Sequence, residues 1–88
     1  MDLRNEETLK ANLARNMRFL RLQRKPLLSQ KMLAKKLGVT QKSISRYETA
    51  ICLPPAHVLL AMADVFGFTA DELFGERLPS RKGRENNE

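Results

Sequence analysis

The sequence has one cysteine, one histidine, one tyrosine and no tryptophan. Because Cys52 is the only thiol, an intrachain disulfide and a cysteine-cluster metal site are excluded. One histidine and scattered carboxylates supply no nucleophile and base set, so we expect no enzyme, no metal and no cofactor. No apolar run approaches the about 18 residues of a membrane span, and the charged start is unlike a secretory signal, so we expect a cytoplasmic protein.

Acidic residues are in the minority. The sequence has 10 Asp and Glu against 16 Lys and Arg, which gives a net charge of +6 and favours a polyanionic partner. The positive charge avoids residues 54–74, which have no Lys or Arg and form the most apolar part of the chain. We expect this segment to face the core or a partner subunit rather than a polyanion.

Hydrophobic spacing predicts an all-α fold of five helices, with no strand signal. The predicted helices cover residues 5–24, 30–37, 41–49, 54–66 and 69–75. Cap residues support their starts, which are expected at Asn5, Ser29, Thr40 and Thr69. The first helix should bury one stripe, formed by Leu9, Leu13, Met17 and Leu20. We expect one domain over residues 1–75 and a flexible polar tail over residues 76–88.

Residues 29–48, SQKMLAKKLGVTQKSISRYE, have the pattern of two short helices joined by a tight turn. In the helix predicted over residues 41–49, several polar or cationic side chains fall within roughly a 140° arc, at about 100° per residue. They are Gln41, Lys42, Ser45, Arg46 and Thr49. Ile44 and Tyr47 point the other way, so one face is apolar. The polar face suits the base edges and phosphates of a DNA major groove.

These residues resemble the lambda-repressor-like helix-turn-helix family, in particular its Xre/Cro type. The resemblance covers roughly residues 13–74. It rests on LSQKMLAKKLGVTQKSISRYE, on Pro54 in the following loop, and on LLAMADVFGFTADELF. It implies a compact five-helix bundle in which the second and third helices form the helix-turn-helix. It also implies double-stranded DNA as a partner and a homodimer on a near-palindromic site.

The resemblance further implies roles for single residues. The expected base-contacting residues are Gln41, Lys42 and Arg46. The expected DNA-backbone contacts are Gln30, Lys31, Ser43, Ser45, Tyr47 and Thr49. Gln30 would also brace Gln41, and Tyr47 is more readily explained as a core residue. Arg21 and Glu48 are expected to form a structural ion pair between the first helix and the end of the third.

The chain departs from the family pattern directly after the third helix. Ala50 stands where the family commonly has glycine, and a positive φ at this alanine would cost roughly 1 kcal/mol or somewhat more. Ile51 and Cys52 replace a stretch that is often polar or basic in the family. An apolar contact to a partner is therefore an alternative role for this loop.

The leading hypothesis is a sequence-specific DNA-binding transcriptional regulator, a repressor, that acts as a dimer. The predicted dimer surface consists of Phe68, Leu73, Phe74 and Leu78, and the alternative is that they only close the core. The tail cations Arg77, Arg81, Lys82 and Arg84 are expected to be solvated, with a minor-groove arm as the alternative. The rival function is a protein-binding module, such as an antitoxin, that holds its partner through residues 51–53, the fifth helix or the tail.

Overall fold

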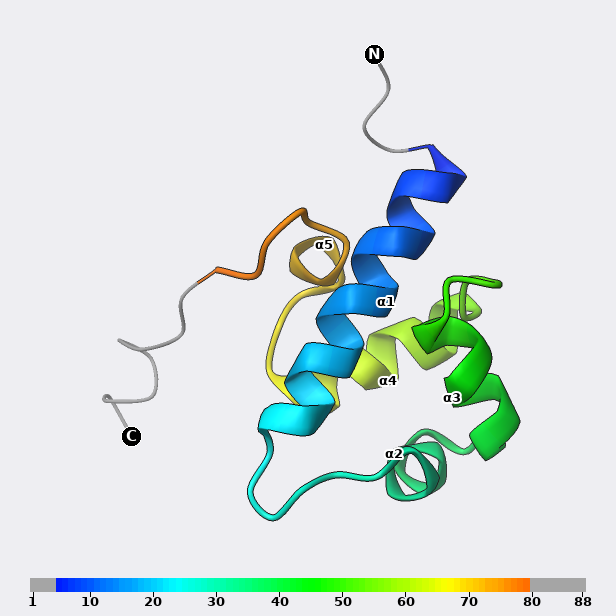
Figure 1. Cartoon of the computed structure of the whole chain (residues 1–88), viewed down its shortest axis with the longest axis vertical. Helices are drawn as coiled ribbons and strands as arrows, with labels where there is room; N and C mark the ends of the chain where they lie inside the picture. Colours follow the sequence, from blue (N-terminus) through cyan, green and yellow to red (C-terminus); the bar gives the residue numbers. More distant parts are fainter. Residues whose placement is uncertain (1–4, 80–88) are drawn as a thin grey trace.

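The computed structural model describes residues 5–79, which form five helices and no strand (Figure 1). The helices are α1 (Glu6–Gln23), α2 (Gln30–Leu37), α3 (Gln41–Glu48), α4 (Ala56–Phe66) and α5 (Ala70–Leu73). The predicted all-α, five-helix fold is confirmed. α4 begins later than predicted, since Pro55 is its N-cap, and α5 ends at Leu73 rather than Gly75. The predicted boundary between a domain and a tail stays a prediction.

Side-chain caps determine where four of the helices begin. In each, an oxygen of the cap side chain accepts a hydrogen bond from the backbone N–H three residues further along the chain. The caps are Asn5, Ser29, Thr40 and Thr69. Glu72 completes the predicted capping box by accepting from the Thr69 backbone N–H at 2.9 Å. Each such cap stabilises a helix by about 1 kcal/mol, which matters for helices of eight residues or fewer.

The helices pack around α1, with α3 against one side of it and α5 against the other (Figure 1). α4 packs against both α2 and α5 and closes the bundle. The largest fully buried side chains come from all five helices; they are Leu13, Met17, Leu33, Ile44, Met62 and Leu73. In the predicted α1 stripe, Leu13 and Met17 are fully buried, whereas Leu9 and Leu20 are half-buried.

Two asparagines of α1 hold the C-terminal end of α5. Asn12 donates to the carbonyl of Phe74 at 2.9 Å, and Asn16 donates to the carbonyls of Leu73 and Gly75 at 2.8 and 2.9 Å. The last carbonyls of a helix have no partner within the helix, so these side chains satisfy groups that would otherwise be unpaired. Asn12 and Asn16 are both buried, at 8% and 3% exposed. This contact fastens a four-residue helix that has little stability of its own.

We expect the substitution Asn16→Leu to lower the free energy of unfolding by about 1–3 kcal/mol, because it removes the donor from two main-chain carbonyls. Chemical denaturation monitored by circular dichroism measures the loss. The matched control is Gln23→Leu, which makes a similar change at an exposed position of the same helix. Equal losses in the two variants would contradict a role for the Asn16 hydrogen bonds.

Ala50 follows α3 with φ of 62°, in the left-handed region. Its N–H donates to the carbonyl of Tyr47 at 3.2 Å, so this conformation closes the end of the helix. The positive φ that the family glycine suggested is therefore present, with an alanine in place. The β-carbon makes this conformation unfavourable by roughly 1–2 kcal/mol.

We expect Ala50→Gly to raise the free energy of unfolding by up to about 1 kcal/mol, since relief of the strain exceeds the extra entropy of glycine in the unfolded chain. The reverse change, Gly38→Ala, tests the same principle. Gly38 has φ of 71°, and an added β-carbon would meet nothing within 4 Å. We therefore expect Gly38→Ala to lower the free energy of unfolding through backbone strain alone, without a steric clash. An Ala50→Gly variant less stable than the parent chain would contradict this interpretation.

Candidate nucleic-acid interface

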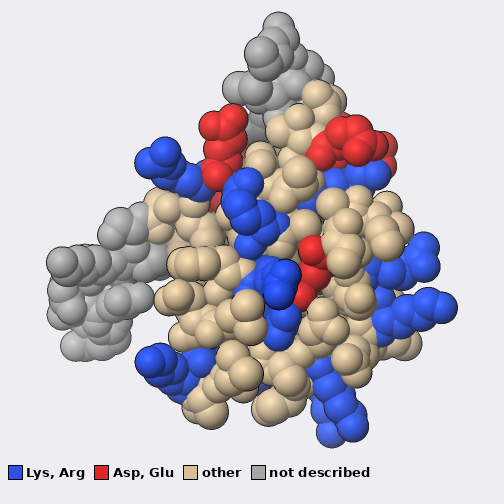
Figure 2. All heavy atoms as spheres, in the orientation of Figure 1, with Lys and Arg blue, Asp and Glu red and all other residues tan. Residues whose placement is uncertain are grey.

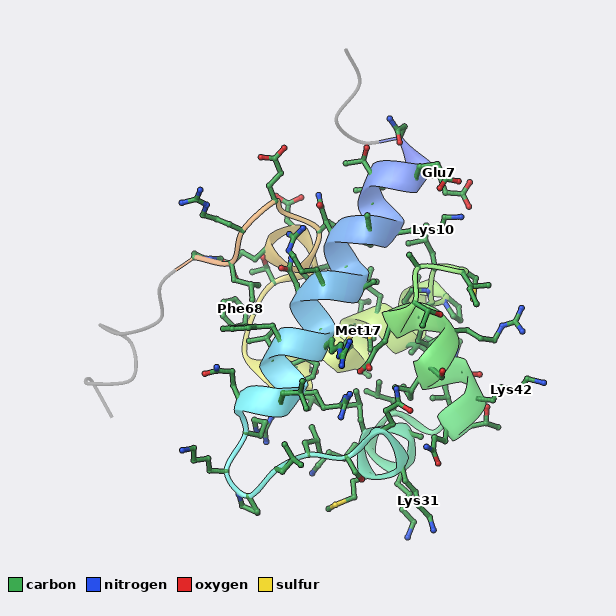
Figure 3. All side chains as sticks on the ribbon, in the orientation of Figure 1. Glu7, Lys10, Met17, Lys31, Lys42 and Phe68 are labelled. Atoms are coloured by element: carbon green, nitrogen blue, oxygen red, sulfur yellow. The ribbon has the colours of Figure 1, made fainter. Side chains whose placement is uncertain are left out.

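The predicted base-contacting side chains lie on one outward face of α3. Gln41, Lys42 and Arg46 are exposed. Lys42 points from α3 away from the body of the molecule (Figure 3). On the opposite face Ile44 is fully buried and Tyr47 is 6% exposed. α3 therefore has the two faces that its sequence predicted.

The residues predicted to contact the DNA backbone differ in their exposure. Thr49 and Lys31 are exposed, and Gln30, Ser43 and Ser45 are half-buried beside the outward face. Tyr47 is different, since its position, one turn after Ile44, places its ring in the core. The burial of Tyr47 favours its explanation as a core residue, and a contact from it to the DNA backbone stays a prediction.

The turn between α2 and α3 sets the position of this face. Gly38 ends α2 with φ of 71°, and the N–H of Val39 donates to the carbonyl of Ala34 at 3.0 Å. Thr40 then caps α3. Ala34 is 4% exposed, and its small side chain allows α2 and α3 to pack closely. A short turn closed by these hydrogen bonds therefore positions the outward face of α3.

A buried ion pair ties α3 to α1. Arg21 Nε donates to Glu48 Oε2 at 2.6 Å, and Arg21 Nη2 donates to Glu48 Oε1 at 2.9 Å. The two side chains are 9% and 3% exposed. Arg21 Nη1 also donates to the carbonyl of Leu28 at 3.2 Å, which fastens the loop ahead of α2. The pair predicted between Arg21 and Glu48 therefore joins three segments of the chain.

Gln30 connects this pair to the start of α3. Its Nε2 donates to Glu48 Oε1 at 3.0 Å, and its Oε1 accepts from Gln41 Nε2 at 3.5 Å. Gln30 and Gln41 are the first residues of α2 and α3, respectively. A chain of hydrogen bonds thus runs from α1 through Glu48 and Gln30 to Gln41.

Positive charge gathers on the same side of the molecule. The exposed cations of α2 and α3 are Lys31, Lys35, Lys36, Lys42 and Arg46. Figure 2 shows Lys and Arg side chains projecting from the edge that α2 and α3 form, and Lys31 points outward from α2 (Figure 3). Glu48 is the one acidic residue of these two helices, and it is paired with Arg21. The outward edge is therefore suited to a polyanion.

A model of the helix-turn-helix domain family matches residues 12–74, which is most of the chain. The chain belongs to this family. The match confirms the resemblance noted from the sequence and is consistent with the Xre/Cro type. No curated protein and no solved structure matches the chain.

Part of the predicted dimer surface lies inside this helix-turn-helix domain. Leu73 is fully buried and Phe68 is 9% exposed, so both close the core of a single chain. Figure 3 shows Phe68 on the segment that leads to α5. Phe74 and Leu78 are partly buried against the same core. Their burial favours the alternative that Phe68 and Leu73 close the core, and the dimer surface stays a prediction.

The apolar loop after α3 exposes one large side chain. Ile51 is 56% exposed, whereas Cys52 and Leu53 pack partly against the core.

Among the tail cations, Arg77 is exposed, and Arg81, Lys82 and Arg84 lie outside the described residues. Within the described part of the helix-turn-helix protein, no helix is sufficiently long and apolar to traverse a bilayer.

Proposed function

We propose that this helix-turn-helix protein is a sequence-specific DNA-binding transcriptional regulator that acts as a repressor. The observation that carries the proposal is the outward face of α3. Three exposed side chains with base-reading chemistry, Gln41, Lys42 and Arg46, stand on a helix whose other face is buried. In this proposal α3 lies in the major groove, and the protein binds rather than catalyses.

Each side chain of the face has a chemical role in the proposal. Arg46 and Lys42 donate to guanine O6 and N7, and Gln41 pairs with adenine N6 and N7. The other residues at the edge contact phosphates and position the helix; they are Gln30, Lys31, Ser43, Ser45 and Thr49. Because phosphate contacts carry no direct sequence information, specificity comes from the first three residues.

We further propose that the protein binds as a homodimer on a near-palindromic operator. A single copy presents one recognition helix, and two copies related by a two-fold axis would read two half-sites about one helical turn apart. Phe74 and Leu78 are the predicted contact residues that remain outside the fully buried core. Such a regulator, encoded by a bacterium or by a phage, would act in the bacterial cytoplasm.

A protein-binding role is the second candidate, and the exposed Ile51 favours it. An antitoxin, for instance, would hold its partner through residues 51–53, α5 or the tail. This role is tested by asking whether the untagged product of a neighbouring gene purifies together with the tagged protein. The Ile51→Ser variant should lose the partner and keep its fold, whereas a partner that is absent or bound equally by the variant would count against this role.

Selection of bound duplexes from a random DNA library tests the regulator proposal. We expect enrichment of one motif with two-fold symmetry. A parallel selection with a Gln41→Ala, Arg46→Ala double variant should not recover that motif. Recovery of the same motif by both proteins, or no enrichment with the parent protein, would overturn sequence reading by α3.

A further inference from the structure

We propose that a second copy of this chain docks in solution on the outward face of α1, with the two α1 helices antiparallel. This face consists of exposed residues on the side of α1 that is turned away from the core; they are Ala11, Arg15, Arg18, Phe19 and Leu22. The inference deepens the homodimer proposed above and rests on it. It assigns the contact between copies to α1 instead of to the C-terminal residues Phe74 and Leu78.

The outward face of α1 exposes two large apolar side chains one turn apart. Phe19 is 54% exposed and Leu22 is 47% exposed. Residues three apart on a helix are neighbours on its surface, so these two form one apolar patch. Arg15 and Arg18 lie beside the patch and are exposed. Aromatic and arginine side chains are enriched in protein interfaces, so this composition favours a protein rather than DNA as the occupant.

The two ends of α1 have opposite charges. Its first turn contains Glu6 and Glu7, and the chain then has no Asp or Glu until Glu48. At its C-terminal end, Arg24 and Lys25 are exposed. Figure 2 shows Asp and Glu side chains at the end of the molecule where α1 begins, and Lys and Arg side chains further along it. A second copy therefore complements the charges of this helix when its own α1 runs in the opposite direction.

An antiparallel pairing centred near Arg15 brings these features into contact. It places Phe19 of one copy against the small side chain of Ala11 of the other, since each lies four residues from the centre. By the same count, Arg24 lies opposite Glu6, and both contacts occur twice because the interface is isologous. The two Arg15 side chains are directed away from each other, because each donates to main-chain carbonyls that follow α5. A parallel pairing would instead bring like charges together at both ends.

The position of this face leaves both copies of α3 available to one DNA duplex. Arg21 points from α1 to Glu48 of α3, whereas Asn12 and Asn16 point to the end of α5. At about 100° per residue these are opposite flanks of α1, and the outward face lies between them. In an antiparallel pair the two-fold axis runs from one flank to the other, so α3 of each copy lies on the same side of the dimer (Figure 1). A two-fold symmetric operator requires this arrangement.

The experiment measures the association of the full chain without DNA, by sedimentation equilibrium across micromolar concentrations. We expect a reversible dimer that Phe19→Ser weakens by about tenfold or more, because each dimer loses two buried aromatic side chains. The matched control is Leu60→Ser, which makes a comparable change on α4 at a side chain that is 60% exposed. It should dimerise as the parent chain does. Circular dichroism verifies that each variant is folded.

An exchange of charges tests the antiparallel register. Arg24→Glu places a carboxylate opposite Glu6 and should weaken the dimer, and Glu6→Arg should weaken it likewise. A chain with both substitutions regains opposite charges in both symmetry-related pairs and should recover the affinity of the parent chain. Low ionic strength suits these measurements, since exposed charges are then least screened. If the doubly substituted chain dimerised no more tightly than the single variants, the antiparallel pairing would be wrong.

The remaining outcomes separate the inference from the proposed function. A folded Phe19→Ser variant that dimerises as tightly as the parent chain would overturn the inference and leave the homodimer standing. Loss of the dimer in Leu78→Ser, but not in Phe19→Ser, would place the contact at the C-terminal residues. A parent chain that is monomeric at every concentration would overturn both the inference and a homodimer in solution. A dimer that depends on Phe19, together with no enriched DNA motif, would overturn the DNA-reading function alone.

Discussion

The substitution Glu48→Ala is expected to lower the free energy of unfolding by about 3–5 kcal/mol, the cost of leaving one partner of a buried ion pair unpaired. Arg21 would remain in a site where its side chain is 9% exposed, and the Gln30 amide would lose its acceptor. Total stabilities of domains are about 5–15 kcal/mol, so the loss is a large fraction of the whole. Denaturant unfolding measures it directly.

The control for this prediction is Glu7→Ala, which breaks the ion pair between Glu7 and Lys10 at 3.3 Å. Figure 3 shows this pair near the N-terminal end of α1. The Glu7 side chain is 86% exposed, and such surface pairs typically contribute about 0–1 kcal/mol. If Glu48→Ala and Glu7→Ala were equally stable, the buried ion pair would not be the interaction that holds α3 to α1.

The substitution Arg46→Ala is expected to weaken binding to the selected DNA site by about 5- to 150-fold, which corresponds to the loss of a bidentate base contact of about 1–3 kcal/mol. The side chain is exposed on the outward face of α3, so the free energy of unfolding should change little. Binding to random duplex should fall much less, since it loses one charge and no base contact. Fluorescence anisotropy with both duplexes measures the two effects.

Arg77→Ala provides a charge-matched control for Arg46→Ala. Arg77 is exposed beyond α5, which packs on the other side of α1 from α3 (Figure 1). Both variants lose one positive charge, so a role of Arg46 through the net charge of the chain alone would affect them similarly. We expect Arg77→Ala to bind the selected site almost as the parent chain does. Equal losses in the two variants would show that Arg46 contributes only to the net charge and does not recognise a base.

The positions of the helices were predictable because their signals are local. The side chain of a cap such as Ser29 or Thr40 accepts a hydrogen bond from an N–H only three residues away. Gly38 adopts the left-handed conformation that ends α2 at its own position. The buried and exposed faces of α3 also follow from the spacing of Ile44 and Tyr47 alone. The strain at Ala50 was predictable only through the resemblance, since nothing in the local pattern demands a positive φ there.

The contacts between distant segments were not predictable. Asn16 bonds to carbonyls 57 and 59 residues further along the chain, and periodicity assigns an asparagine no partner. The burial of Phe68 and Leu73 likewise depends on how α5 lies across α1, which hydrophobic spacing in α5 does not determine. The link from Gln30 to Glu48 joins residues 18 apart and required the folded arrangement of α2 and α3.

We propose that the outward face of α3 reads a DNA sequence, and a single titration distinguishes this claim from nonspecific binding. The parent protein is titrated against the selected duplex and a random duplex of equal length over a series of salt concentrations. We predict binding to the selected duplex that is tighter by about 10³-fold or more, with affinity falling in salt by a log-log slope of about −0.9 per phosphate contacted. Equal affinities for the two duplexes at every salt concentration would contradict the claim.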